Sequence, residues 1–359
     1  MIRKYLFASF ISLLALNAEA RELKIYNWSN FISEDTIKNF EKATDINVKY
    51  DVYDSDHALD ARLYVGKIGY DIVVPSAFPF LKRQKNLGLY QKIDKSKLKN
   101  YKNLDPLIMD KMKEGGVDEY GVPWMWGTVG IGYNKEAIQK IMPGKDLNSL
   151  KYFFNKNNIK QLEKCGVMMM DAPNEILPMI YVYLGLNPNS EKPEDLEQVG
   201  SVLSAIRPHV KQFHSSRYID ALVNGEVCAV IGFSGDIMQA KYRAAELNKP
   251  FEIAYVIPEE GTQLWIDSFA IPENAKNVNE AYEFLDYLLK PEVAAENSNN
   301  LGFANANKLS KDFLNDNIVN NKSIYLTPKD IDKTYILQPL SLHSEKLRSK
   351  LWIRTIANH

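Results

Sequence analysis

Short apolar segments and amphipathic segments alternate along this chain, and this alternation constrains the fold more than any other feature of the sequence. Residues 23–26 predict a strand, residues 46–52 alternate apolar with polar side chains, and residues 71–74 form a short apolar run. Ser33 and the two acids after it suit the start of a helix between the first two strands. Because a continuous apolar strand is typical of a parallel sheet covered on both faces, the pattern predicts an open α/β sheet flanked by helices.

The same alternation recurs in the second half of the chain. Three more strands are predicted, over residues 227–231, 253–257 and 265–271. Residues 237–247 are predicted to be helical, and apolar residues at helical spacing between Ala281 and Leu288 predict another helix that Pro291 stops. The 359 residues are enough for two domains at about 150 residues each. No flexible linker separates the two sets of strands, so we expect two lobes that the chain crosses through ordered strands.

The first twenty residues have a different character. Two basic residues precede an apolar run that ends near Leu16, and Ala18-Glu19-Ala20 then forms a small-x-small site. This is the layout of a cleaved secretory signal peptide. The run is too short to span a bilayer, which needs about 20 apolar residues, and no cysteine stands near the site for lipid anchoring. We therefore expect residues 1–20 to be removed and the mature, soluble chain to be exported, beginning near Arg21.

Composition and motifs exclude several classes of protein. With 44 Lys and Arg against 45 Asp and Glu, the chain lacks the basic excess of a nucleic-acid binder. No P-loop and no G-x-G-x-x-G sequence is present, and residues 232–236 lack the last glycine of a nucleophile elbow. The five histidines do not have metal-ligand spacing. We therefore predict no catalytic residue, no cofactor and no metal, and an enzyme with a dispersed site is kept as an alternative.

The two cysteines, Cys165 and Cys228, lie far apart in the sequence. Two are too few for a disulfide scaffold. In an exported protein they either form one disulfide, because oxidising compartments preserve such bonds, or remain two buried thiols that pack as small apolar groups. The sequence alone leaves both readings open.

Five predicted strand ends combine carboxylates or serines with aromatic side chains. They are residues 27–31, 75–76, 171–175, 233–236 and 265–268. In open α/β sheets, ligands bind at the carboxyl ends of the strands. Taken singly, each segment is explained better by core packing or by a solvated helix terminus than by a ligand site. Together they predict a pocket of acids between aromatic faces, which suits an organic cation through cation–π contacts and charge-assisted hydrogen bonds.

The chain resembles the periplasmic polyamine-binding proteins of ABC transporters, most closely their putrescine-binding members, in the segments YNWSNFI, DIVVPSA, MDAPNEI, CAVIGFSGD, WIDSFAIP and FANANK. The similarity runs in unbroken order from about Glu22 to Lys308 and more weakly to the C-terminus. The resemblance implies a type II periplasmic binding protein fold. Two α/β lobes, each a mainly parallel sheet flanked by helices, then close over a ligand in the cleft. One lobe would comprise residues 21–131 with 264–301, and the other residues 132–263 with 302–359.

The resemblance also implies roles for three acids and a serine. Glu175 matches a carboxylate that holds one ammonium group, and Asp267 matches the aspartate that binds the other amine deep in the cleft. Asp236 matches an acid of the putrescine-preferring members, where spermidine-preferring members have serine. Ser76 matches the serine that follows the buried strand. Three negative charges would thus face a dication.

The remaining pocket positions form its walls. Those that keep the family's residue types are Trp28, Ser29 and Trp265. Four others depart from the putrescine-binding pattern, with Asn30 in place of an aspartate, Phe31 and Phe303 in place of tyrosines, and Phe233 in place of a tryptophan. The apolar wall survives, whereas one negative charge and two hydroxyl groups are lost. The choice among polyamines therefore stays open.

The function implied by the resemblance is binding rather than catalysis. The protein would be a monomeric periplasmic receptor that captures a polyamine, putrescine first, and delivers it to an inner-membrane ABC permease without a cofactor. The alternatives are a receptor for spermidine, cadaverine or another organic cation on the same fold, or a sensing partner that reports polyamines to a membrane receptor. The resemblance further implies that Cys165 and Cys228 form the family's disulfide.

Overall fold

The first three strands form a small parallel sheet with helices in the connections, as the alternation predicts. This computed structural model describes residues 21–357 apart from 30 and 67, so the predicted signal peptide lies outside the described residues. Strand β1 (Glu22–Trp28) lies between β2 (Asn47–Tyr53) and β3 (Ile72–Val73), and both pairings are parallel. The connections contain α1 (Glu34–Thr44) and α2 (Asp56–Leu63). Residue 33 precedes α1 with an extended backbone, but the Ser33 side chain makes no capping hydrogen bond.

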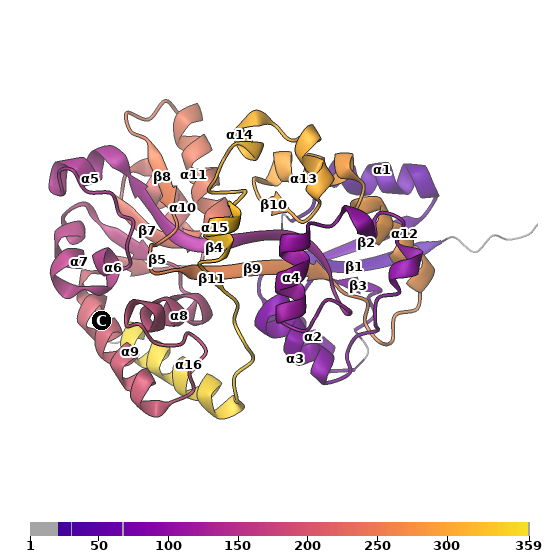
Figure 1. The fold of residues 1–359 in the computed structure, drawn as a ribbon, viewed down its shortest axis with the longest axis horizontal. Coiled ribbons are helices and arrows are strands. Elements are labelled where there is room, and N and C mark those ends of the chain that lie inside the picture. Colours follow the sequence, from indigo (N-terminus) through magenta and orange to yellow (C-terminus); the bar gives the residue numbers. More distant parts are fainter. Residues whose placement is uncertain (1–20, 30, 67, 358–359) are drawn as a thin grey trace, which may run out of the picture.

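A long strand, β4 (Val122–Asn134), connects this region to the larger sheet, and the hydrophobic pattern did not single it out. Its first half pairs antiparallel with β9 (Thr262–Phe269), and its second half pairs antiparallel with β7 (Ala229–Phe233) and β8 (Ile253–Val256). All thirteen residues of β4 are buried. Strands β4 and β9 run side by side from one group of helices to the other (Figure 1), which agrees with the expected crossing through ordered strands.

The larger sheet is mixed. Its strand order is β11-β9-β4-β7-β5-β6, with β8 and β10 paired to β4. The pairings β5–β6, β5–β7 and β9–β11 are parallel, whereas every pairing of β4 is antiparallel. The strands not yet bounded are β5 (Val167–Met169), β6 (Gln212–Phe213), β10 (Ala304–Asn305) and β11 (Thr334–Tyr335). With helices around both sheets, the fold is of the α/β class (Figure 1).

Helices surround both sheets. Figure 1 shows α1 to α4, α12 and α13 near the small sheet, where the bounds not yet given are α3 (Lys82–Asn86), α4 (Pro106–Glu114), α12 (Val278–Leu288) and α13 (Pro291–Leu301). The other helices are α5 (Lys135–Ile141), α6 (Lys151–Phe154), α7 (Lys156–Leu162), α8 (Pro173–Tyr183), α9 (Pro193–Ile206), α10 (Arg217–Asn224), α11 (Ser234–Glu246), α14 (Asp316–Val319), α15 (Pro328–Ile331) and α16 (Leu342–Ala357). Short 3₁₀ or π turns cover Ala77–Leu81, Lys95–Lys97, Tyr101–Asn103, Glu163–Cys165, Arg207–His209 and Lys308–Phe313.

Helix boundaries differ from the predictions at two places. Helix α12 ends at Leu288, and Pro291 is the first residue of α13 rather than only a stop signal. Proline is well suited to this position, because its missing N–H has no partner at a helix start. Helix α11 begins at Ser234, directly after β7, and not at residue 237. This immediate strand-to-helix connection brings Asp236 into the first turn of α11.

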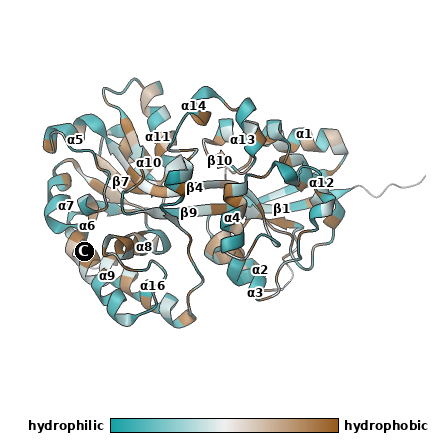
Figure 2. Ribbon diagram, viewed as in Figure 1, coloured by the Kyte–Doolittle hydropathy of each residue, from teal (hydrophilic) through white to brown (hydrophobic). Residues whose placement is uncertain are grey.

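A buried helix and a disulfide pack against or join parts of the larger sheet. Helix α8 is largely buried and mostly hydrophobic in colour, whereas the exposed faces of α1 are hydrophilic (Figure 2). Cys165, in the turn after α7, and Cys228, directly before β7, form a disulfide with 5.4 Å between their Cα atoms. The bridge that the resemblance implied is thus confirmed.

No described helix has the length and apolar character to cross a bilayer. The predicted lobe boundaries stay a prediction.

Candidate ligand-binding site

One cavity of about 220 Å³ brings together side chains that are far apart in the sequence. Of the eleven predicted ligand residues, ten line it: Trp28, Ser29, Phe31, Ser76, Glu175, Phe233, Asp236, Trp265, Asp267 and Phe303. The eleventh, Asn30, lies outside the described residues. Five lining residues were not predicted: Asp56, Phe78, Pro79, Phe80 and Gln263. The cavity is therefore built from both sheets and from the helices that follow their strands.

Strand and helix ends explain why these residues meet. Trp28 is the last residue of β1, and Ser76 follows shortly after β3, which is parallel to it. Phe233 ends β7, and Glu175 lies in the first turn of α8. Because carboxyl ends of parallel strands share one edge of a sheet, local sequence at these ends determines what the cavity contains. The strand-end reasoning therefore located part of the lining, whereas Trp265 and Asp267 lie within β9.

Aromatic rings form a continuous wall. The ring centroids of Phe31 and Phe303 are 5.6 Å apart, those of Trp265 and Phe303 are 5.6 Å apart, and those of Phe233 and Trp265 are 6.2 Å apart. All three pairs meet edge to face, an arrangement that aromatic quadrupoles favour. The Trp28 indole N–H donates to the carbonyl of Val74 at 2.8 Å, which fixes its orientation.

Two glycines allow this wall to pack. A Cβ atom on Gly235 would lie 1.9 Å from Cε1 of Phe303, and one on Gly127 would lie 2.5 Å from Cζ2 of Trp265. Both distances are far below van der Waals contact, so only glycine permits these rings to approach the backbone. Gly235 of the GFSGD segment thus has a packing role beside the ligand wall.

Strand β9 presents one polar face to the cavity. Gln263, Trp265 and Asp267 alternate along the strand and therefore point to the same side. Asp267 is 7% exposed, and its Oδ1 accepts a hydrogen bond of 2.7 Å from the Ser76 hydroxyl. Oε1 of Gln263 and the indole N–H of Trp265 are buried, and neither has a hydrogen-bond partner among the described residues. Buried polar groups are normally satisfied, so this face is built to meet a further polar group.

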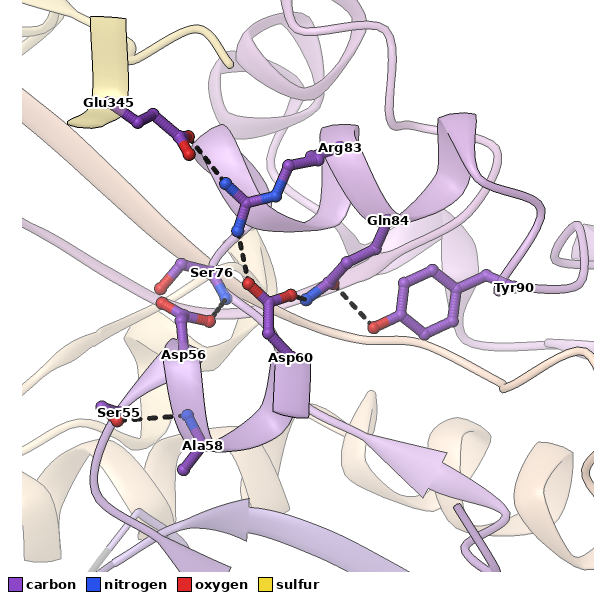
Figure 3. A network of polar contacts seen from close by, with 9 residues as sticks. All are labelled: Ser55, Asp56, Ala58, Asp60, Ser76, Arg83, Gln84, Tyr90 and Glu345. Carbon is purple, nitrogen blue, oxygen red and sulfur yellow. Dashed lines mark hydrogen bonds and ion pairs between the residues drawn. The ribbon is translucent and has the colours of Figure 1, made fainter. Parts of the chain in front are cut away.

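An acid that the sequence reasoning missed stands at the start of α2. Asp56 lines the cavity and is 8% exposed. Its carboxylate accepts the backbone N–H of Ser76 at 3.1 Å, and Figure 3 shows this bond beside the Ser55 cap of the same helix. Asp56 follows β2 by three residues, as Ser76 follows β3, but the acid was missed because an acid in the first turn of a helix is common for reasons of the helix dipole alone.

Four acids of this cavity form no ion pair within the described part of the chain. Among the described residues, no ion pair includes Asp56, Glu175, Asp236 or Asp267. A buried carboxylate is costly unless a cation or several hydrogen-bond donors compensate it. When these acids are ionised, the cavity has an excess of negative charge, which either protonation or a cation from outside can neutralise.

Burial of these acids and, for three of them, repulsion from another acid raise their pKa values. Burial, reinforced by the charge of Asp60 and opposed by the hydrogen bonds from Ser76, raises the pKa of Asp56 to about 7. Burial and then the Asp56 charge raise the pKa of Glu175 to about 7. The same two causes raise the pKa of Asp267 well above its usual range. Burial also raises the pKa of Asp236, although the hydroxyl of Tyr218 donates to it and opposes the shift.

The arrangement suits an elongated organic cation better than a metal ion. Within the described residues, no three or more His, Cys, Asp or Glu side chains are grouped so that they could hold a metal. The acids are instead distributed around an apolar wall of aromatic rings. Carboxylates accept charge-assisted hydrogen bonds from ammonium groups, and ring faces attract cations and cover methylene groups.

The fold and this cavity define a class, the type II periplasmic solute-binding proteins. The chain belongs to the bacterial extracellular solute-binding protein family, whose profile matches residues 35–324. It is 40% identical over 348 residues to the putrescine-binding periplasmic protein PotF of Escherichia coli K12, covering 96% of this chain and 94% of PotF. It is also 40% identical over 349 residues to the putrescine-binding periplasmic protein SpuD of Pseudomonas aeruginosa UCBPP-PA14, covering 97% and 95%.

Solved structures share the fold. A putative spermidine/putrescine ABC transporter protein from Listeria monocytogenes superposes with a TM-score of 0.81 at 29% identity, covering 93% of this chain and 98% of that chain. The substrate-binding protein PotD from Streptococcus pneumoniae gives a TM-score of 0.79 at 24% identity, with the same coverage. The expected two-lobed binding-protein fold is therefore confirmed.

Proposed function

We propose that this protein captures a polyamine, putrescine in the first place, in the periplasm and delivers it to an ABC transporter permease. The observation that carries the proposal is a set of four carboxylic acids around a cavity walled by aromatic rings: Asp56 and Asp267 are buried, Glu175 and Asp236 are partly buried, and none forms an ion pair within the described part of the chain. Diammonium compounds combine two cations with an apolar chain and match both features. Two relatives at 40% identity, both putrescine-binding periplasmic proteins, support the same ligand and compartment.

In the proposed complex, the methylene chain lies along the aromatic wall. Phe31, Phe303 and Trp265 cover it, and each ammonium group near a ring face gains up to about 2 kcal/mol when desolvated. Asp267 holds one ammonium group, while Glu175 and Asp236 hold the other. Because residues from both sheets contact one ligand, binding favours the closed arrangement, which the permease then recognises.

A receptor for another polyamine is the second candidate, and one observation favours it. The wall at Phe31, Phe233 and Phe303 carries no hydroxyl or indole N–H at these three positions, so it fixes the chain by apolar contact alone. Such a wall discriminates weakly by chain length. Selection then depends on where the acids stand, because a misplaced ammonium group would remain unpaired.

Titration calorimetry tests both candidates. Ligand-free protein, prepared by unfolding and refolding so that co-purified ligand is removed, is titrated with putrescine, cadaverine, spermidine and spermine. Putrescine is expected to bind most tightly. If a longer polyamine binds more tightly, the second candidate replaces the first, and if none of the four binds, the proposed function is wrong.

A single substitution tests the pocket. Asp267→Asn is expected to weaken putrescine binding by about 3–5 kcal/mol, because a buried ammonium group loses its charged partner. The exposed Asp54→Asn serves as the control, since it removes an equal charge outside the cavity. A change of less than twofold in the Asp267→Asn dissociation constant would contradict the proposed pocket.

A further inference from the structure

The cavity contains one more acid than the resemblance assigns to the ligand, and that acid is Asp56. It is the first residue of α2, is 8% exposed and lines the same cavity as Asp267. One oxygen of its carboxylate accepts the backbone N–H of Ser76 at 3.1 Å. The hydroxyl of Ser76 donates to Asp267 at 2.7 Å. One serine therefore links two carboxylates that come from different elements, α2 and β9.

Asp56 forms no ion pair with any described residue, although the charge of Arg83 weakly favours its ionised form. The groups around it are Tyr53 of β2, Asp60 on its own helix, Arg83 of α3, Glu175 of α8, Asp267 of β9 and Tyr90. Only Arg83 in this set is a cation, and its guanidinium is bonded to Asp60 and Glu345, as Figure 3 shows. Asp56 thus faces mostly acids and phenols.

A purely structural role does not account for the charge. An acid at a helix start interacts favourably with the helix dipole, but a partly exposed side chain would do this without burial. An asparagine would accept the same hydrogen bond from the Ser76 N–H and would bring no charge into a cavity that already holds three acids. A buried carboxylate is retained at a cost, so it needs a cationic partner that the described chain does not supply.

We propose that Asp56 contacts the ligand and, together with Asp267, brackets one terminal ammonium group. The proposal rests on the proposed function and deepens it, because it names the chemistry selected at this end of the cavity. A primary ammonium has three N–H donors and can bond to Asp56 and Asp267 at the same time. A secondary ammonium has two donors and a second carbon substituent that would enter the space between the acids. This end of the cavity therefore selects ligands with a primary amine terminus.

Binding at such a paired site also displaces protons. Burial holds the pKa of Asp56 near 7 in the ligand-free protein, so part of the Asp56 population is protonated at neutral pH. A bound ammonium group lowers that pKa, because an adjacent opposite charge favours the ionised carboxylate. Putrescine binding at pH 7 is thus coupled to proton release, to which Asp56 contributes.

The test compares Asp56→Asn with Asp54→Asn in ligand-free protein. Both substitutions remove one negative charge from the same segment, but Asp54 is exposed and does not line the cavity. Calorimetry with putrescine at pH 7.5 is expected to show a dissociation constant at least about tenfold higher for Asp56→Asn and within twofold of wild type for Asp54→Asn. Titrations at pH 7 in buffers of different ionisation enthalpy are expected to show fewer protons released per putrescine in Asp56→Asn only.

The outcomes separate the two proposals. If the wild-type protein binds no diamine, the proposed function fails and the role of Asp56 fails with it. If the wild-type protein binds putrescine and Asp56→Asn behaves as Asp54→Asn does, only the role of Asp56 is overturned. Thermal melting verifies that each ligand-free variant is folded. Should Asp56→Asn not fold, Asp56→Ser, which also keeps a hydrogen-bond acceptor, carries the same expectation.

Discussion

Two carboxyl groups of the cavity titrate close to neutral pH. Burial, with a contribution from the charge of a neighbouring acid, raises the pKa of Glu175 and of Asp56 to about 7. In the ligand-free protein both groups are therefore mostly neutral at pH 6 and mostly ionised at pH 8. The ammonium groups of an alkyl diamine, which resemble that of lysine, stay protonated across this range. Only the receptor, and not the ligand, changes charge between these two pH values.

The affinity for putrescine is therefore expected to rise with pH between 6 and 8. Below pH 7 the ligand must first displace protons from the carboxyl groups, and each displaced proton makes the logarithm of the association constant rise by up to about one per pH unit. We expect affinity at least about tenfold weaker at pH 6 than at pH 8. Calorimetric titrations at pH 6, 7 and 8 measure this.

Glu175→Gln provides the matching variant for this prediction. The amide does not titrate, so the pH dependence of putrescine affinity is expected to become shallower, while binding at pH 8 becomes weaker than in the wild type. The exposed Asp54→Asn variant should retain the full wild-type slope. A wild-type affinity that is independent of pH over this range would contradict the assignment of the cavity acids as ligand contacts.

Most residues that follow strands could be predicted, including Glu175 and Asp236 in the helical turns after β5 and β7, whereas Gln263 and Asp56 were missed. Trp28 and Ser76 were found because the parallel strands β1 and β3 end at one edge of a sheet, whereas Asp267 lies within β9 and its role was implied by the resemblance. Gln263 was missed, although it precedes Trp265 by two positions on the same strand face, a signal that strand alternation contains. Asp56 also stands at a strand end, three residues after β2, but only the tertiary contact with the Ser76 backbone distinguishes it from an ordinary acid of a first helical turn.

At the scale of elements, the strands with a regular pattern of apolar residues were the easiest to predict. Strand β4 (Val122–Asn134) was not predicted, because all of its residues are buried and its sequence therefore lacks alternation, while Pro123 and three glycines interrupt its apolar run. The pairing of β4 with β9 in one half and with β7 in the other depends on distant segments. Such long-range pairing is not encoded in any local window.

The disulfide belongs to this scale, because it joins the turn after α7 to the start of β7. Its cysteines are 63 positions apart, and closing a loop of that length is expected to stabilise the fold by about 2–4 kcal/mol. Neither cysteine lines the ligand cavity. The double variant Cys165→Ala, Cys228→Ala should therefore lose about that much free energy of unfolding and should bind putrescine with wild-type affinity.

Denaturant unfolding of ligand-free protein measures the loss, and calorimetry measures the affinity. Reductant should destabilise the wild-type protein in the same way and should leave the double variant unchanged. A double variant with wild-type stability would show that the bridge does not constrain the unfolded chain. A large loss of affinity in the double variant would show that the bridge positions the cavity.

At the scale of the whole molecule, contacts connect the beginning of the chain to its end. Arg83 of α3 bonds on one side to Asp60 of α2 and on the other, at 2.8 Å, to Glu345 of α16 (Figure 3). The neighbouring Lys82 bonds to Gln338, which also lies in the C-terminal segment. The predicted lobe boundaries place Arg83 and Glu345 in different lobes, so these contacts would form when the lobes close. Helix α2 also begins with Asp56, which connects this network to the cavity.

Glu345→Gln is expected to weaken putrescine binding about two- to fivefold, mainly through faster dissociation. The side chain of Glu345 is one-third exposed and that of Arg83 about one-fifth, so their ion pair contributes only about 0.5–1 kcal/mol to the closed arrangement. Stopped-flow fluorescence of the tryptophans in the cavity wall measures the two rate constants. The exposed Glu197→Gln on α9 is the charge-matched control, with wild-type rates expected. If Glu345→Gln also dissociates at the wild-type rate, the contact between α3 and α16 does not stabilise closure, and ligand contacts alone hold the two lobes together.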